Sequence, residues 1–234
     1  MKTVAVVTGG TKGIGKAIIR ELASNGFDII SCSRTKSDLE ELKFEIQNDF
    51  NVAILTYQVD MSQENEVKKF AKSVLSETEG VEILVNNTGV FIPGQIHTEE
   101  EGTLEKMINT NLYSAYHLTR ALISKMKENK KGHVFNICST ASFIPYVDGG
   151  SYCISKFAML GFSKVLREEM KEFDIRVTAI MPGATMSASW EGVDLPQERF
   201  MKAEDVSKAL YNAYEMSDRT VIEEIVMRPQ LGDI

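Results

Sequence analysis

The segment Tyr152-Cys153-Ile154-Ser155-Lys156 contains the single Y-x-x-x-K spacing of the chain. Side chains four residues apart share one face of a helix, so a helix here would bring the phenol beside the ammonium. A phenol ordinarily ionises at about pH 10 and is a poor proton donor at neutral pH, but a neighbouring ammonium stabilises its phenolate. The pair predicts a proton-transfer centre, although an isolated Tyr-Lys pair can also be a surface packing pair.

Two further polar residues lie where they could serve the same chemistry. Ser139 ends the β-branched run Gly132–Ser139, and its hydroxyl could hold the oxygen of a carbonyl substrate. Asn111 lies in the long helical stretch before that run and could anchor a water molecule behind Lys156, as part of a proton relay.

A glycine-rich turn follows the first apolar run, in Thr8-Gly9-Gly10-Thr11-Lys12-Gly13-Ile14-Gly15. A strand that enters a helix through glycines lets the backbone approach a pyrophosphate and points free N–H groups at that anion. The spacing is G-x-x-x-G-x-G rather than the G-x-G-x-x-G of the common dinucleotide fingerprint. We expect a nucleotide at this turn; the alternative is that the glycines serve only a tight bend.

The residues after the second apolar run indicate which dinucleotide is bound. NAD requires a carboxylate about 20 residues beyond the glycines for its ribose 2′-hydroxyl, and the segment Ser31-Cys32-Ser33-Arg34-Thr35 offers none before Asp38. Arg34 and Lys12 could instead face the 2′-phosphate of NADP(H), unless both are solvated surface cations. Asp60, after the third run, is the expected acceptor for the adenine amino group or else a helix N-cap.

Short apolar runs alternate with amphipathic stretches along the whole chain. Runs nearly continuous in Val and Ile are typical of strands covered on both faces, and apolar residues at three- and four-residue spacing predict helices between them. This alternation predicts an α/β fold with a mainly parallel sheet and helices on both faces. The clearest helices are Ile14–Asn25 and Glu64–Glu77. The expected strands are Val4–Thr8, Asp28–Ser33, Val52–Gln58, Val81–Asn86, Gly132–Ser139, Ile175–Met181 and Val221–Met227.

Length and composition limit the classes of protein that remain. The 234 residues suit one domain, residues 1–234. A formal net charge of -7 without a basic stripe disfavours nucleic acid as a partner, and no apolar run is long enough to span a membrane. The three cysteines (Cys32, Cys138 and Cys153) cannot all pair and lack metal-ligand spacing, so we expect buried thiols in a reducing cytoplasm and no metal. Three scattered histidines are expected at the surface: His97, His117 and His133.

The order and spacing of these motifs resemble those of the short-chain dehydrogenase/reductase family. The glycine turn, Asn86-Asn87-Thr88-Gly89, Asn111, Ser139 and the Y-x-x-x-K segment all match, and the similarity continues into Pro182-Gly183. It implies a single Rossmann-like domain of three layers, with a seven-stranded parallel sheet between helices. It also implies hydride transfer between a nicotinamide and a carbonyl or alcohol, and assembly as a homodimer or homotetramer. Thr88 stands where the family usually has Ala, and Ser187 stands where Thr usually follows Pro-Gly.

The positions that match the family's motifs define the expected site. The implied catalytic set is Asn111, Ser139, Tyr152 and Lys156. The expected cofactor contacts, with their neighbours in the same segments, are Gly9, Thr11, Lys12, Gly13, Ile14, Ser33, Arg34, Asp60, Met61, Asn87, Gly89, Tyr152, Lys156, Pro182, Gly183 and Thr185.

The carboxyl-terminal third is similar to bacterial sepiapterin reductases and their relatives. The similarity lies in Pro182-Gly183-Ala184-Thr185, in Ser187-Ala188-Ser189-Trp190 and in the ending from Val221 to Ile234. Residues 184–202, approximately, are the expected substrate lid.

Apolar and aromatic side chains follow the later strands and should border the substrate. No Arg or Lys lies between Gly183 and Pro196, which disfavours an anionic substrate bound by the lid. Trp190 is expected to lie over the substrate, or else to pack as a lid residue against its own helix. The expected substrate contacts are Phe91, Phe143, Tyr146 and Trp190.

Together these features predict an NADPH-dependent oxidoreductase that reduces a small neutral carbonyl compound, with Tyr152 as proton donor. The substrate could be a ketone, a diketone or the side chain of a pterin; the alternative is a 3-oxoacyl-[acyl-carrier-protein] reductase. A non-catalytic NADP-binding redox sensor is the alternative from another class, and the complete catalytic set counts against it. A methyltransferase would leave Ser139, Tyr152 and Lys156 without a shared role.

Overall fold

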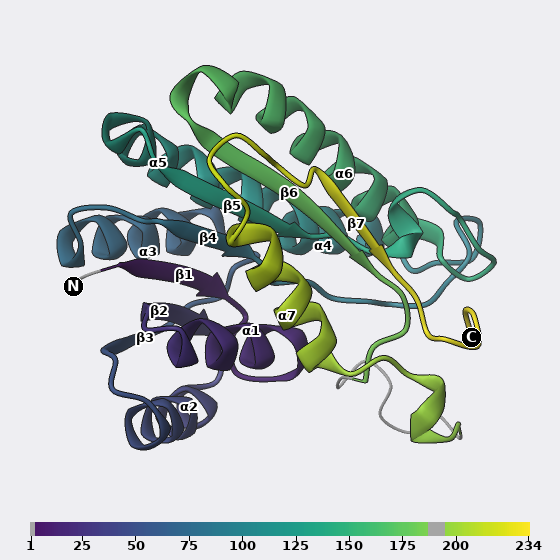
Figure 1. Ribbon diagram of the computed structural model, residues 1–234. Helices are drawn as coiled ribbons and strands as arrows, with labels where there is room; N and C mark the ends of the chain where they lie inside the picture. The colour runs from purple at the N-terminus through teal and green to yellow at the C-terminus, as the bar shows by residue number, and fades with distance from the viewer. Residues whose placement is uncertain (1–2, 187–194) are drawn as a thin grey trace.

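The computed structural model describes residues 3–186 and 195–234, and within them seven strands form one sheet in the order β3-β2-β1-β4-β5-β6-β7. Every pair of neighbouring strands is parallel, so each connection crosses over a face of the sheet (Figure 1). The strands are β1 (Val4–Thr8), β2 (Asp28–Ser33), β3 (Ile54–Gln58), β4 (Ile83–Asn86), β5 (Gly132–Ile137), β6 (Ile175–Pro182) and β7 (Glu224–Met227).

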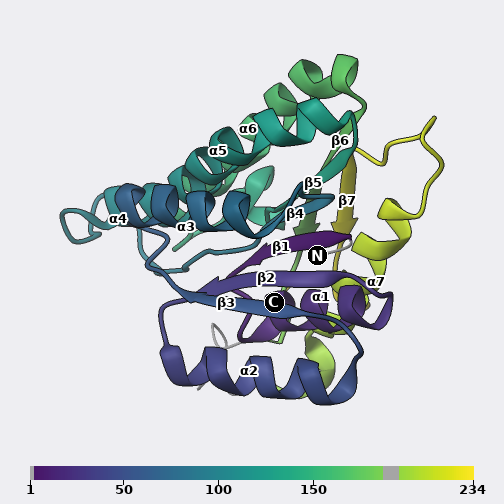
Figure 2. The same ribbon diagram turned by 90° about the vertical axis from the view of Figure 1, so that its left-hand side faces the viewer.

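Helices cover both faces of the sheet, which completes the three predicted layers (Figure 2). α1, α2 and α7 lie on one face, and α3, α5 and α6 lie on the other. A π-helical turn, Asn109–Tyr113, joins α4 to α5, and a single 3-10 turn, Thr140–Ser142, follows β5. The helices are α1 (Gly13–Ser24), α2 (Lys36–Asp49), α3 (Glu64–Glu77), α4 (Thr103–Ile108), α5 (Ser114–Asn129), α6 (Gly150–Met170) and α7 (Ala203–Tyr214).

The alternation of side chains along each strand divides the core into two layers. In β1, Val4 and Val6 face the side covered by α3, α5 and α6, whereas Ala5 and Val7 face the side covered by α1, α2 and α7. Both sets are buried, which is why the strand sequences are nearly continuous in Val and Ile. The α/β fold class and the seven expected strands are confirmed. The differences are at strand ends, where β3 begins at Ile54 rather than Val52.

The chain order of the strands reverses beside β1. After β1 the chain moves outward to β2 and β3, and then returns to place β4 on the other side of β1. The crossovers on the two sides of this point lie on opposite faces and leave a crevice at the carboxyl ends of β1 and β4. The fold therefore directs a ligand to the residues that follow these two strands.

The three cysteines are buried and unpaired, as expected. Burial raises the pKa of the Cys32 thiol to about 12 and also raises the pKa of Cys138. Both thiols are therefore neutral near pH 7.

None of the described helices combines the length and the hydropathy needed to cross a lipid bilayer.

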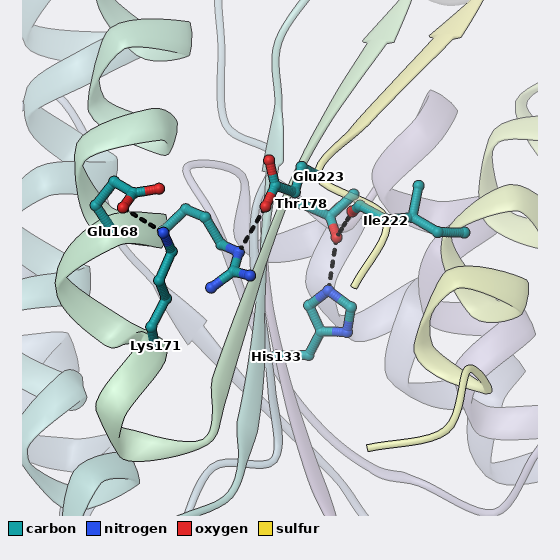
Figure 3. Close-up of polar contacts among 7 residues, drawn as sticks. His133, Glu168, Lys171, Thr178, Ile222 and Glu223 are labelled. Carbon is teal, nitrogen blue, oxygen red and sulfur yellow. Dashed lines mark hydrogen bonds and ion pairs between the residues drawn. The ribbon is translucent and has the colours of Figure 1, made fainter. Parts of the chain in front are cut away.

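His133 is fully buried on β5, so the expected surface position is wrong for this residue. Thr178 Oγ1 donates its one proton to the carbonyl oxygen of Ile222 at 2.6 Å (Figure 3). Nε2 of His133 lies 2.7 Å from Thr178 Oγ1, so this nitrogen must be the donor in that hydrogen bond. The neutral ring stacks on Phe135 with 3.8 Å between centroids. Burial, and then the charge of Arg176, lowers the pKa of His133 well below its usual 6.5.

This buried imidazole predicts a pH-dependent stability. Below about pH 6.5 the unfolded chain binds a proton at His133 while the folded chain does not, so the free energy of unfolding falls as pH decreases. The loss approaches about 1.4 kcal/mol per pH unit for one proton. His133→Gln should therefore show a shallower decline than the wild type in urea denaturation at pH 7.5, 6.5 and 5.5. His97→Gln, at an exposed position, should keep the wild-type slope; equal slopes in all three proteins would contradict the assignment.

Candidate active site

A cavity of about 750 Å³ lies at the carboxyl ends of the strands. Its wall comes from the segments that follow β1, β2, β3, β4, β5 and β6, together with the first turns of α1 and α6. This is the position that the reversal of strand order predicts for a ligand site.

Tyr152 and Lys156 both face this cavity from the first two turns of α6, as their four-residue spacing predicts. Lys156 is only 5% exposed, and its Nζ donates to the carbonyl oxygen of Ile137 at 2.9 Å. The same Nζ lies 5.8 Å from the centroid of the Tyr152 ring, and the Phe91 ring contacts that ring edge-on at 4.9 Å. The structure thus brings a phenol and a buried ammonium together at a ligand-sized cavity.

Ser139 lines the cavity where β5 ends. Its Oγ accepts the N–H of Ala141 at 3.1 Å, while its own N–H donates to Ser142 Oγ at 3.2 Å. This reciprocal capping fixes the side chain at the start of the turn Thr140–Ser142. Because Oγ serves there as an acceptor, its proton is available to donate to a ligand oxygen.

Asn111 lies directly behind the cavity wall and is buried in the π-helical turn. Its Oδ1 accepts the N–H of Val90 at 2.7 Å, and its Nδ2 donates to the carbonyl of Val90 at 3.0 Å and to Ser155 Oγ at 2.9 Å. The side chain therefore fastens the segment after β4 to α6. Ser139, Tyr152 and Lys156 gather at the cavity, whereas Asn111 supports them from behind.

The glycine turn forms the cavity wall at the start of α1. A Cβ at residue 15 would lie 2.3 Å from the carbonyl oxygen of Gly9, so only glycine permits this close approach of helix and turn. Asn87 Nδ2 holds the turn by donating to the carbonyls of Thr8 and Gly9 at 2.9 and 3.0 Å. α1 has no acidic residue in its first turn, and Lys12 at its N-cap gives no side-chain cap. Its first N–H groups can therefore serve an anionic ligand.

Polar and basic residues surround the end of β2. Ser33 and Arg34 line the cavity, and Thr11, which is not part of the wall, donates to Ser33 Oγ at 3.2 Å. Lys12 also lines the cavity, and its ammonium forms an ion pair with the Asp38 carboxylate at 3.2 Å. Asp38, the first acidic residue after β2, is therefore paired with Lys12.

Asp60 lines the cavity beyond β3 together with Met61. Asp60 Oδ1 accepts both the N–H and the hydroxyl of Ser62, at 3.0 and 2.8 Å. These bonds make Asp60 a turn residue ahead of α3, and they fix its carboxylate at the cavity edge. Of the expected cofactor residues, all except Thr11 belong to the cavity wall: Gly9, Lys12, Gly13, Ile14, Ser33, Arg34, Asp60, Met61, Asn87, Gly89, Tyr152, Lys156, Pro182, Gly183 and Thr185.

The expected substrate residues divide into three groups. Phe91 and Tyr146 line the cavity, whereas Phe143 does not and instead lies 5.9 Å beneath the guanidinium of Arg228. Trp190 and the lid residues 187–194 lie outside the residues that the structure describes. Burial, and then Tyr152 and Cys153, raises the pKa of Tyr146 above its usual value of 10, so this second phenol is a neutral hydrogen-bond donor.

Several residues of the wall were not predicted from the sequence. Lys106 of α4 adds a cation, and the last residues Asp233 and Ile234 close one side. Asp233 pairs with Arg228, and its carbonyl accepts a hydrogen bond from Arg199 at 3.3 Å. No local motif marks these positions, because each reaches the cavity from a distant part of the chain.

A glycine turn at the strand-order reversal, with a Tyr-Lys pair and a serine across the same cavity, is characteristic of a dinucleotide-dependent oxidoreductase. The family model described as short chain dehydrogenase matches residues 3–197, and the chain belongs to this family of oxidoreductases.

Relatives and solved structures are similar over nearly the whole chain. A sepiapterin reductase from Chlorobaculum tepidum is 33% identical over 242 residues, covering 100% of this chain and 99% of the relative. A metagenomic short-chain oxidoreductase in complex with NADP has 30% identity and a TM-score of 0.86, with 97% of each chain covered. L-sorbose reductase from Gluconobacter frateurii, complexed with NADPH and L-sorbose, has 26% identity and a TM-score of 0.90, covering 97% of this chain and 95% of that chain.

Proposed function

We propose that the protein is an NADPH-dependent reductase of small neutral carbonyl compounds. The observation that supports this most strongly is the convergence of Ser139, Tyr152 and Lys156 on one cavity that the glycine turn also lines. Carbonyl reduction needs a hydrogen-bond donor for the carbonyl oxygen, a proton donor and a charge that stabilises the resulting phenolate. The serine hydroxyl, the phenol and the buried ammonium together can meet these three needs.

The residues present fit NADP(H). The uncapped start of α1 suits a pyrophosphate, and Arg34 suits a 2′-phosphate at the end of β2. Thr88 Oγ1 is buried without a hydrogen-bond partner among the described residues, which fits a polar ligand against this wall. NADP and NADPH are the cofactors in the metagenomic oxidoreductase and the sorbose reductase.

The proposed mechanism assigns one role to each residue. The bound cofactor supplies a hydride for the carbonyl carbon. Ser139 donates a hydrogen bond to the carbonyl oxygen, and Tyr152 transfers its phenolic proton to that oxygen as the π electron pair moves there, which gives the alcohol. Lys156 stabilises the phenolate that remains, and solvent returns the proton. Asn111 keeps the segment after β4 against α6.

The walls of the cavity support a small neutral substrate. Phe91, Ile144 and Tyr146 supply apolar surface and one neutral hydroxyl. Two similar proteins lend support to this substrate class: one is a sepiapterin reductase, and the other is an L-sorbose reductase complexed with L-sorbose. Lys106 favours a second candidate function, the reduction of a 3-oxoacyl thioester carried on an acyl-carrier protein. This exposed cation at the cavity wall could bind an acidic carrier protein. A non-catalytic sensor would give the Tyr-Lys pair no task.

Replacing the phenol tests the mechanism. Tyr152→Phe should lower kcat/KM by about 10² to 10⁴-fold because the proton donor is lost, while NADPH still binds. NADPH oxidation with diketones, quinones, a pterin and acetoacetyl thioesters measures activity, and NADPH fluorescence measures binding. Phe143→Leu, an aromatic change outside the cavity wall, is the control. Equal turnover by Tyr152→Phe and the wild type would exclude Tyr152 as the acid.

Replacing Arg34 tests the choice of cofactor. Arg34→Ala should weaken NADPH binding by about 10- to 100-fold, the value of one charge-assisted hydrogen bond to phosphate, and should leave NADH binding unchanged. Fluorescence titration with both cofactors measures the two affinities. Lys36→Ala, at an exposed cation two residues away, should change neither. An equal loss for NADPH and NADH would mean that Arg34 does not contact the 2′-phosphate.

We also propose that the protein forms a homodimer or homotetramer through α5 and α6. Large apolar side chains stay exposed on these helices and the turn before them: Tyr113, Tyr116, Ile154, Phe157 and Val165. Val165 on α6 is 58% exposed, and a second copy would bury it. Val165→Asp should therefore shift the molar mass in light scattering towards the monomer. Phe44→Asp, at a 68% exposed position on α2, should not; a monomeric wild type would contradict this proposal.

Two broader assignments follow from the same proposal. Residues 1–234 would act as one domain, since a single sheet runs through the whole set of described residues. The reducing cytoplasm is the proposed location, and the three buried, unpaired thiols support it.

A further inference from the structure

The loop between β4 and α4, residues 87–102, packs against the first turn of α6. The N–H of Gly94 donates to the carbonyl of Asp148 at 2.9 Å, and Gln95 Nε2 donates to the Asp148 carboxylate at 2.8 Å. Gly94 also forms an isolated parallel bridge with Gly149, the residue before α6. Segments about 50 residues apart are therefore joined directly ahead of Tyr152.

Glu99 caps α6 from this loop. Its carboxylate accepts the backbone N–H of Ser151 at 2.8 Å and also accepts the Ser151 hydroxyl. α6 has no acidic residue in its own first turn, and Gly149 at its N-cap has no side chain to offer. The first N–H groups of a helix lack partners within the helix, and negative charge is favoured beside them. Glu99 supplies the cap that the sequence of α6 lacks.

Gly150 makes this contact possible. A Cβ at residue 150 would lie 2.1 Å from Glu99 Oε1 and 2.6 Å from the carbonyl oxygen of Gly94. Any side chain there would push the carboxylate and the loop away from the helix. The cap therefore depends on a side-chain acceptor oxygen at residue 99 and on glycine at 150.

The same loop touches the site at two further points. The Phe91 ring packs edge-on against the Tyr152 ring, and the Val90 backbone is bonded by Asn111. Ser151 directly precedes Tyr152, so the cap fixes the peptide that carries the phenol. Lys156 is fixed separately, one turn later, by the carbonyl of Ile137.

We propose that Glu99 is a positioning residue for proton transfer: by capping α6 from the loop after β4, it holds Tyr152 in register with Lys156 and Ser139. The inference rests on the proposed reductase function, in which Tyr152 gives the proton. Glu99 itself contacts neither substrate nor cofactor in this role, and its effect passes through the first turn of α6.

The test compares three variants of the contact with a matched control. Glu99→Ala removes the cap, Glu99→Gln keeps one acceptor oxygen, and Gly150→Ala crowds the cap from the helix side. Glu100→Ala is the control, because Glu100 is the adjacent glutamate and is exposed. Hydrogen–deuterium exchange of residues 149–156 in the full-length free protein reports the helix start. kcat and the KM for NADPH report the reaction.

The cap predicts a specific pattern across these variants. Glu99→Ala should speed exchange in the first turn of α6 by about tenfold or more, and should lower kcat by about 10- to 100-fold, while the KM for NADPH stays within about twofold. Gly150→Ala should do the same, although alanine is the better helix former. Glu99→Gln should recover most of kcat because its amide oxygen still accepts the Ser151 N–H. Glu100→Ala should match the wild type.

Other outcomes would overturn the proposal. Wild-type exchange and wild-type kcat in Glu99→Ala would exclude a positioning role. The role would also be excluded if Glu99→Ala lowers the Tm but keeps the wild-type kcat at an assay temperature well below that Tm. Equal losses in Glu99→Ala and Glu100→Ala would show only the effect of loop charge. If the wild type reduces no carbonyl compound while exchange still responds to Glu99→Ala, the reductase function fails and the cap on α6 is upheld.

Discussion

The ammonium of Lys156 is the group on which the arrangement of the site depends. An ammonium taken out of water without compensation costs several kcal/mol, so a buried lysine must be met by acceptors. One of its three N–H donors is bonded to the Ile137 carbonyl, and the cavity offers room for ligand oxygens on the other side. Because Ile137 ends β5, this one hydrogen bond ties α6 to the sheet and fixes the depth at which Tyr152 enters the cavity.

A buried polar network beneath the site fixes the neighbouring elements. Asn86 of β4 donates to Thr119 of α5 at 3.0 Å and to Asn136 of β5 at 2.8 Å, and Asn136 donates to Ser163 of α6 at 2.8 Å. Polar groups buried this deeply are costly unless paired, so a shift of one strand or a rotation of α6 would break several bonds together. The network thereby favours a single alignment of β4 and β5, the two strands that precede Asn87 and Ser139.

The parts of the structure that the sequence predicts well are those encoded locally. Val and Ile runs define the strands, and the spacing of Tyr152 and Lys156 is a property of one helix. The parts that it misses depend on contacts between distant segments. Glu99 reaches Ser151 across 52 residues, and Asp233 reaches the cavity only because the chain after β7 folds back. The burial of His133 is not predictable from the sequence, because nothing near this residue in the chain indicates that the Thr178 hydroxyl will accept its hydrogen bond.

The position of the last two residues has a practical consequence for making the protein. Asp233 and Ile234 form part of the cavity wall at the carboxyl ends of the strands, whereas β1 begins at the opposite end, where the amino ends of the strands lie. A purification handle or fluorescent fusion joined after Ile234 would therefore add chain at the mouth of the ligand site and disturb the pairing of Asp233 with Arg228. Handles for expression, immobilisation or labelling belong ahead of β1, on the side of the molecule that the ligand does not approach.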